Sequence, residues 1–302
     1  YFLQRVSNLH GDYSLRAVID PDTGSCLLLR NGILYSDRMV IHIDTNGNNL
    51  IPVEINHELG KFGFQENDSI RLFEVQSKML EDFYGFPVKI ESAVILPPSY
   101  ASSPDRTYPV VFVFPGWGST HVTPTLPGAG KFQLDRYGAR DGMEKIYVFL
   151  NQDSRYGYHV FANSENNGPR ATSFVVEFMP ALENAYRVSK RPEGRFLTGQ
   201  SSGAWAALWL MINYPETFGM AWAGSPDPVD FRAFVSVDLY HDTNFFYDEE
   251  GMPRNSIRDD KIKFSLKDWV DMETVLGEGG QYQSFEAVFG RKDNRGTPEQ
   301  LF

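Results

Sequence analysis

Short runs of wholly apolar residues recur along the second part of the chain, from about residue 88 onward. Residues 110–114 and 146–150 are apolar at every position, and further runs begin at Phe196 and Met220. Continuous apolar segments of this length are typical of strands in a parallel sheet that is buried on both faces. The pattern therefore predicts a mostly parallel sheet in this part of the chain.

Two segments with helical periodicity lie between these predicted strands. Residues 171–187 carry a large apolar side chain at every fourth position, and residues 203–214 carry them at i, i+3, i+4 and i+7 before Pro215. Each spacing places the apolar side chains on one face of a helix. Strands that alternate with helices indicate an α/β fold. Within the second helix we expect Trp205 to pack in the core, with a contact to substrate as the alternative.

Residues 1–87 show a different pattern. The turn-forming pairs Asn31-Gly32 and Asn46-Gly47 separate short apolar runs, as they do in β-hairpins. We therefore expect two domains: a smaller β-rich accessory domain at residues 1–87 and an α/β domain at residues 88–302.

Composition and charge exclude several classes of protein. The 302 residues include 28 Lys+Arg against 39 Asp+Glu, a formal net charge of −11, whereas a non-specific nucleic-acid binder normally shows a basic face. The sequence has no run of about 18 apolar residues, so it predicts no transmembrane helix. The single cysteine, Cys26, can form neither an internal disulfide nor a Cys-rich zinc site. We predict no metal and no cofactor.

The same features leave the location of the protein open. A chain with one cysteine fits the cytoplasm, the periplasm or a bacterial exterior equally well. The chain begins at Tyr1 without an initiator Met, which is typical of a processed or trimmed start and is compatible with export.

A G-x-S-x-G motif at Gly199, Ser201 and Gly203 carries the candidate chemistry. An apolar strand precedes it and an amphipathic helix follows at once, which is the context of a nucleophile elbow. In such a turn the serine backbone is strained, and side chains two positions away would collide with neighbouring elements, so glycine is needed there. The hydroxyl is then raised at a helix N-terminus, where negative charge is favoured. The alternative is a plain Gly-Ser turn that caps a helix.

The Pro-Gly-Trp-Gly sequence at residues 115–118 supports the first motif, because it follows the apolar run 110–114 directly. An elbow serine needs two N–H donors for the oxyanion, one from the next residue and one from the loop after a preceding strand. We expect the backbone amides of Ser202 and Trp117 to be these donors, with Gly116 as the next choice for the second. The alternative is a flexible loop with a surface tryptophan.

Together these segments resemble a known family. Residues 92–100, 108–119 and 195–207 are similar to the putative-esterase, or esterase D-like, branch of the α/β-hydrolase superfamily. That branch includes feruloyl and acetyl-xylan esterases, enterochelin-type siderophore esterases and mycolyltransferases. The resemblance implies that Ser201 is the nucleophile, that the amides of Trp117 and Ser202 form the oxyanion hole, and that the N-terminal β region is accessory to an α/β-hydrolase core.

The resemblance also raises the question of the general base. A serine hydroxyl needs a histidine to take its proton, and in this superfamily the acid and the histidine follow the serine in the chain. Only His241 follows Ser201, 241 − 201 = 40 residues downstream. We expect His241 to be a surface-loop residue, with a role as the base as the alternative. We expect the acid and histidine to lie beyond Phe302, because residues 298–302 have the character of an interrupted polar loop. The alternative is a pseudo-enzyme that lacks the base.

Residues 156–161 are candidates for substrate specificity, because they follow the run 146–150 and so lie at the carboxyl edge of the predicted sheet. Tyr158 could stack on a sugar or a phenolic acyl group, and His159 could polarise a carbonyl; the alternative is that they stabilise the loop. The sequence thus favours a serine carboxylic-ester hydrolase acting on a small-molecule or glycan ester, with a carbohydrate-linked ester preferred. The alternatives are a non-catalytic glycan-binding protein and an acyltransferase to a sugar hydroxyl.

Overall fold

A mixed six-stranded sheet forms the centre of the molecule in the computed structural model, which describes residues 10–19, 32–44, 51–59, 63–126, 143–256, 264–277 and 279–301. The strands follow the order β15-β14-β8-β9-β7-β6 across the sheet. Their bounds are Ile70–Gln76 for β6, Lys89–Ile95 for β7, Val110–Phe114 for β8, Ile146–Leu150 for β9, Arg195–Gln200 for β14 and Met220–Gly224 for β15.

Four neighbouring strands of this sheet are parallel, as the apolar runs predicted. Strands β15, β14, β8 and β9 pair in parallel, so that Phe196 of β14 lies between Val111 of β8 and Met220 of β15. Strand β7 is antiparallel to β9 and to β6. The carboxyl ends of the four parallel strands meet at one edge of the sheet. The sheet also includes β6, which precedes residue 88, where we expected the α/β domain to begin.

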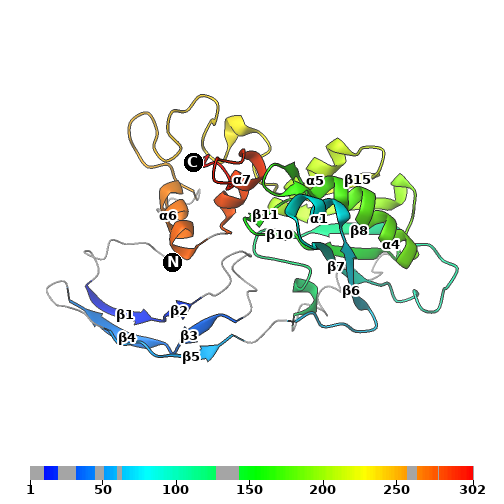
Figure 1. Cartoon of the computed structure of the whole chain (residues 1–302), viewed down its shortest axis with the longest axis horizontal. Coiled ribbons are helices and arrows are strands. Elements are labelled where there is room, and N and C mark those ends of the chain that lie inside the picture. Colours follow the sequence, from blue (N-terminus) through cyan, green and yellow to red (C-terminus); the bar gives the residue numbers. More distant parts are fainter. Residues whose placement is uncertain are drawn as a thin grey trace.

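Helices cover one face of the sheet (Figure 1). They are α1 (Lys78–Tyr84), the continuous segment of α3 (Arg170–Ser173), η3 (Phe174–Phe178) and α4 (Met179–Ala185), and α5 (Ser202–Asn213). Phe112 of β8 packs edge to face on Phe174, and Phe174 stacks on Phe178, so this face holds the larger core cluster. The η3 segment is a π-helical turn just before Pro180. Proline has no N–H to donate, which explains the local loosening.

The other face of the sheet holds a smaller cluster. Val111, Val113 and Phe149 pack there against Phe64 and their neighbours. Towards β15 the face is open in the described part of the chain, and Trp222 is 72% exposed.

The C-terminal part of the chain packs beside α5. It contains η5 (Phe231–Ala233), α6 (Leu266–Leu276) and α7 (Gln281–Phe289). Phe289 at the end of α7 contacts Trp205 of α5 edge to face, with ring centroids 5.3 Å apart. Glu273 of α6 accepts hydrogen bonds from the backbone N–H groups of Gln281 and Tyr282, which joins the two helices.

The N-terminal region is β-rich, as expected. It contains a pair, β1 (Gly11–Leu15) with β4 (Met39–Ile43), and a three-stranded sheet of β2 (Val18–Ile19), β3 (Leu34–Ser36) and β5 (Ile55–Glu58), drawn in blue in Figure 1. Of the two turns predicted there, Asn31 and the Asn46-Gly47 pair lie outside the described residues.

Several short elements complete the fold. The 3₁₀ turns η2 (Thr123–Thr125) and η4 (Pro192–Gly194) lie in loops, and two small hairpins follow β9. The hairpins are β10 (Asp153–Ser154) with β11 (Gly157–Tyr158), and β12 (Asn163–Ser164) with β13 (Gly168–Pro169). Among the described residues, no helix combines the length and the apolar character that crossing a membrane requires.

Candidate active site

A sharp turn between β14 and α5 holds Ser201. Its backbone lies at φ 56° and ψ −124°, a region that a non-glycine residue occupies only under strain. The turn is fixed on both sides: the N–H of Ser201 donates to the Gly224 carbonyl of β15 at 3.1 Å, and the N–H of Ala204 donates to the Ser201 carbonyl at 2.9 Å. The serine therefore stands between the end of a strand and the first turn of a helix, as the motif predicted.

The two glycines of the motif are required by close backbone packing. A Cβ at Gly199 would lie 2.2 Å from the carbonyl carbon and oxygen of Gly203. A Cβ at Gly203 would lie 1.9 Å from the carbonyl oxygen of Phe114 at the end of β8. Both positions are thus closed to any side chain, which confirms the steric reason given for the motif.

Asp227 holds the hydroxyl groups of two consecutive serines. Ser201 Oγ donates to Asp227 Oδ1 at 2.9 Å, and Ser202 Oγ donates to Asp227 Oδ2 at 2.6 Å. The Asp227 side chain is buried, and its own N–H donates to the Ser201 carbonyl at 3.4 Å. Sequence reasoning missed this residue. Its position three residues after β15, at the carboxyl edge of the sheet, was the signal that could have found it.

The loop at residues 115–118 lies directly against the serine turn. A Cβ on Gly116 would be 3.0 Å from the Gln200 carbonyl oxygen and 3.5 Å from Ser201 Cβ. The buried Gln152 donates through Nε2 to the Pro115 carbonyl, and this hydrogen bond holds the start of the loop in place. Trp117 is partly buried and packs against the larger core cluster. The two segments that were expected to supply oxyanion donors are therefore neighbours.

A cavity of about 420 Å³ adjoins this turn. Gly116, Gly199 and Gln200 from the two neighbouring loops line it, together with Thr120 and Trp222. Val113 and Phe149 of the smaller cluster also line it, so it extends onto the face of the sheet away from α5. A substrate that reaches Ser201 from this side would meet hydroxyl groups and one indole.

No histidine hydrogen-bonds Ser201 among the residues that the structure describes. His241 is exposed and its Nδ1 bonds Asp238 Oδ2 at 3.0 Å, which matches the expected surface-loop residue. His121 is buried and its ring stacks on Phe64, with centroids 6.0 Å apart; burial lowers the pKa of His121 below its ordinary value.

The three side chains proposed for substrate binding are buried. Tyr158 donates through its hydroxyl to the Ser119 carbonyl, and Trp205 stacks on Trp209 with centroids 5.3 Å apart. His159 accepts a hydrogen bond at Nδ1 from the Phe161 N–H at 3.1 Å. Packing roles explain all three positions, and a direct contact with substrate stays a prediction. In the described part of the chain, no three side chains of His, Cys, Asp or Glu gather in a group that could hold a metal.

Known proteins resemble parts of this chain. A stretch of 132 residues is 29% identical to Esterase MT1326 of Mycobacterium tuberculosis (strain CDC 1551 / Oshkosh) and covers 42% of this chain. The match spans only 27% of the length of that relative. A solved ferulic acid esterase aligns with a TM-score of 0.44 and 22% identity over 57% of this chain and 67% of its own. An S-formylglutathione hydrolase from Agrobacterium tumefaciens aligns with a TM-score of 0.41 and 18% identity, over 57% and 66% of the two chains.

The family assignment rests on a match along most of the chain. The family described as Putative esterase matches residues 86–277, which is more than half of the 302 residues. The matched span contains β7 to β15, the loop at 115–118 and the turn at Ser201. The resemblance found in the sequence is thereby confirmed, and the chain belongs to the Putative esterase family, with an α/β-hydrolase core preceded by a smaller β-rich region.

Proposed function

We propose that this protein is a serine carboxylic-ester hydrolase that acts through an acyl-enzyme on Ser201. The observation that carries the proposal is the backbone of Ser201, held at φ 56° where β14 meets α5 and packed against the loop at Gly116. Strain of this kind is stored where it positions a reacting group. Membership of the esterase family supports the same reaction.

In the proposed reaction, Ser201 Oγ attacks the ester carbonyl carbon while its proton passes to a general base. As the new C–O bond forms, the carbonyl electron pair moves to oxygen, and the amides of Ser202 and Trp117, or Gly116, donate to that oxyanion. Collapse breaks the bond to the alcohol, which leaves with the proton. Water then hydrolyses the acyl-enzyme and releases the acid.

Asp227 has a positioning role in this proposal. Its carboxylate accepts hydrogen bonds from the hydroxyl groups of both Ser201 and Ser202. It therefore orients the nucleophile and holds in place the residue whose amide would face the oxyanion. We assign the base to the histidine that the family resemblance implies, because a histidine takes the serine proton in this mechanism.

For the substrate we propose an ester linked to a carbohydrate. The cavity beside Ser201 supports this class, because Thr120, Thr123, Thr198 and Trp222 offer hydroxyl groups and an aromatic face to a sugar ring. The β-rich region of β1 to β5 would then be accessory to the catalytic part, whose sheet also takes in β6 from before residue 88. Acyl transfer to a sugar hydroxyl uses the same acyl-enzyme, with an alcohol in place of water, and its products distinguish it from hydrolysis.

The test is ester hydrolysis by the protein expressed from its complete gene. Para-nitrophenyl acetate and acetylated or feruloylated xylo-oligosaccharides serve as substrates, and Ser201→Ala is compared with Ser102→Ala, an exposed serine in a loop. Loss of a serine nucleophile typically lowers kcat by about 10⁶, so Ser201→Ala should fall to a trace while Ser102→Ala keeps the wild-type rate. Undiminished hydrolysis by Ser201→Ala would refute the proposal. Glycan binding without any hydrolysis by the wild type would favour a non-catalytic binding protein.

A further inference from the structure

A buried arginine, Arg170, lies outside the serine site. Arg170 is only 8% exposed, and its Nε donates to the Asn167 carbonyl and its Nη2 to the Tyr84 hydroxyl, each at 3.0 Å. Among the described residues no carboxylate forms an ion pair with it. An arginine cannot give up its proton in a protein, so it remains charged, and a buried charge without a partner is costly.

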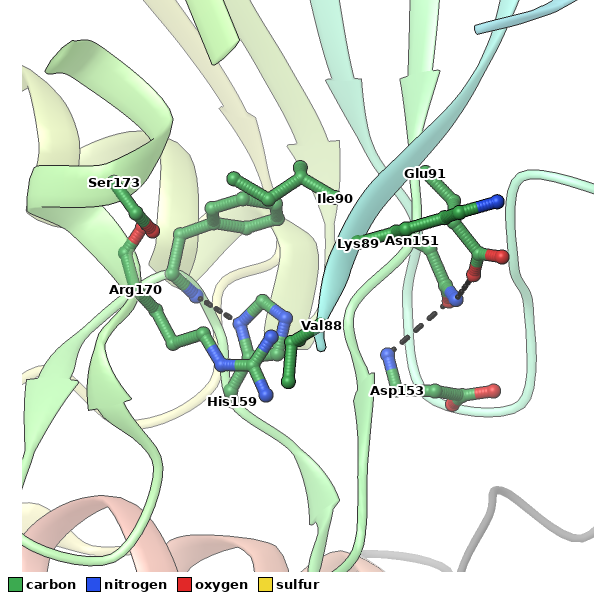
Figure 2. A pocket seen from close by; sticks show the side chains of 10 residues that line it. Val88, Lys89, Ile90, Glu91, Asn151, Asp153, His159, Arg170 and Ser173 are labelled. Carbon is green, nitrogen blue, oxygen red and sulfur yellow. Dashed lines mark hydrogen bonds between the residues drawn. The ribbon is translucent and has the colours of Figure 1, made fainter. Parts of the chain in front are cut away.

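A buried histidine lies beside this arginine (Figure 2). His159 accepts the Phe161 N–H at Nδ1, so the neutral ring carries its proton on Nε2. Burial, and then the nearby charge of Arg170, hold the pKa of His159 well below its ordinary value, so the ring is neutral at ordinary pH. Nε2 therefore offers an N–H donor, and no described residue accepts from it.

The two side chains share a cavity of about 90 Å³, room for several waters or for a ligand of a few heavy atoms. Figure 2 shows Arg170 and His159 together on one side of it and Glu91, Asn151 and Asp153 on the other. The carboxylate of Glu91 is engaged on its own side, where Oε2 accepts from Asn151 Nδ2 at 2.9 Å. The cavity thus has a guanidinium at one wall and the carboxylates of Glu91 and Asp153 at the other, where the ammonium of Lys89 pairs with Glu74.

We propose that this cavity binds a small monocarboxylate of the size of acetate, held by the guanidinium of Arg170 and the ring N–H of His159. The planar guanidinium fork matches the two oxygens of a carboxylate. Val88 and Phe161 in the lining offer apolar contact to a short carbon chain. Glu91 and Asp153 on the far wall repel a second negative charge, which favours a monoanion over phosphate.

The site is separate from Ser201, and its occupation needs nothing from the serine. Its ligand belongs to the chemical class of the acid that an ester hydrolase releases, but the proposal rests on the cavity and not on the proposed function. The acetate site and the proposed esterase function can therefore be refuted independently of each other.

The test is isothermal titration of the full-length protein with sodium acetate, against sodium chloride at the same ionic strength. We expect saturable binding at one site in acetate, weaker binding of phosphate, and none in chloride. Arg170→Met should weaken acetate binding at least tenfold. Arg232→Met removes a positive charge from an exposed pair with Asp230 and should leave binding unchanged. The proposal would be overturned if titration with sodium chloride released or absorbed the same heat as titration with sodium acetate, or if phosphate bound more tightly than acetate.

A second variant keeps the test decisive if Arg170→Met does not fold. Val88→Phe places a ring in the cavity and leaves the guanidinium in place, and it should also abolish acetate binding. In addition, saturating acetate should not slow the reaction of Ser201 with a fluorophosphonate. Acetate that binds both variants as it binds the wild type, or that protects Ser201, would contradict the assignment. If Ser201 does not react at all, the proposed function fails, while the isotherms still show whether the cavity binds acetate.

Discussion

Replacing Gly203 by alanine tests the packing that holds the serine turn. The added Cβ would lie 1.9 Å from the Phe114 carbonyl oxygen, 2.5 Å from the Phe114 carbonyl carbon and 2.7 Å from the Pro115 carbonyl oxygen. All three are backbone atoms of β8 and the loop after it, so no side-chain rotation can relieve the contact. The start of α5 must move away from β8.

The size of the effect follows from that displacement. A separation of about 3 Å is the least that such a contact tolerates, so α5 must shift by roughly 1 Å, and overpacking of this kind costs about 1–3 kcal/mol. For a domain of this size, 1 kcal/mol lowers Tm by about 2–4 °C, which gives a loss of roughly 2–12 °C. A displacement of about 1 Å at a catalytic group can lower the rate about 100-fold.

The assay compares Gly203→Ala with Gly63→Ala in thermal unfolding and in ester hydrolysis. Gly63 is the matched control, because a Cβ there meets nothing within 4 Å. We expect Gly63→Ala to match the wild type in both measurements. A Gly203→Ala protein with wild-type Tm and wild-type hydrolysis would show that α5 and β8 do not pack as described and would refute the reasoning.

Two further predictions concern carboxylates. Asp227→Asn replaces one acceptor oxygen by an NH₂ group, so Ser201 or Ser202 loses its acceptor. We expect chemical denaturation to show that the free energy of unfolding falls by about 1.5–3 kcal/mol, and we expect slower hydrolysis. An unchanged free energy of unfolding and an unchanged rate would contradict the positioning role. The hydrogen bond from the Thr297 backbone N–H is the largest cause that lowers the pKa of Asp293 to about 2. Asp293 therefore contributes stability above its unfolded pKa of 3.8 that is lost as pH falls through about 2. A carboxyl ¹³C NMR titration should give a midpoint near 2, and a midpoint near 3.8 would contradict the contacts.

The sequence could predict the elements whose pattern is local. The wholly apolar runs at 110–114 and 146–150 form β8 and β9. A strand that is buried on both faces is apolar at nearly every position, so it can be recognised from its own residues. Strand β6 was not found as part of this sheet. It is an edge strand in which only Ile70 is buried and the other positions are partly or fully exposed, and nothing in its residues says which sheet it joins.

Some features of the candidate site could likewise be predicted from the sequence, and others could not. The turn at Ser201 was predictable, because the G-x-S-x-G motif lies within five consecutive residues, although the atoms that a side chain at position 203 would meet belong to Phe114 and Pro115. The contact from Asp227 was not, because it depends on how β15 packs beside β14. The burial of Arg170 and His159 could not be predicted either, since residues of β7, of the segment 151–161 and of α3 together line their cavity.

Mass spectrometry of the fluorophosphonate adduct on the full-length protein tests the central claim most directly. We predict a single adduct, mapped to the Oγ of Ser201, that is absent from Ser201→Ala and present in Ser102→Ala. An adduct on another residue, or one that survives in Ser201→Ala, would contradict the assignment of Ser201 as the nucleophile.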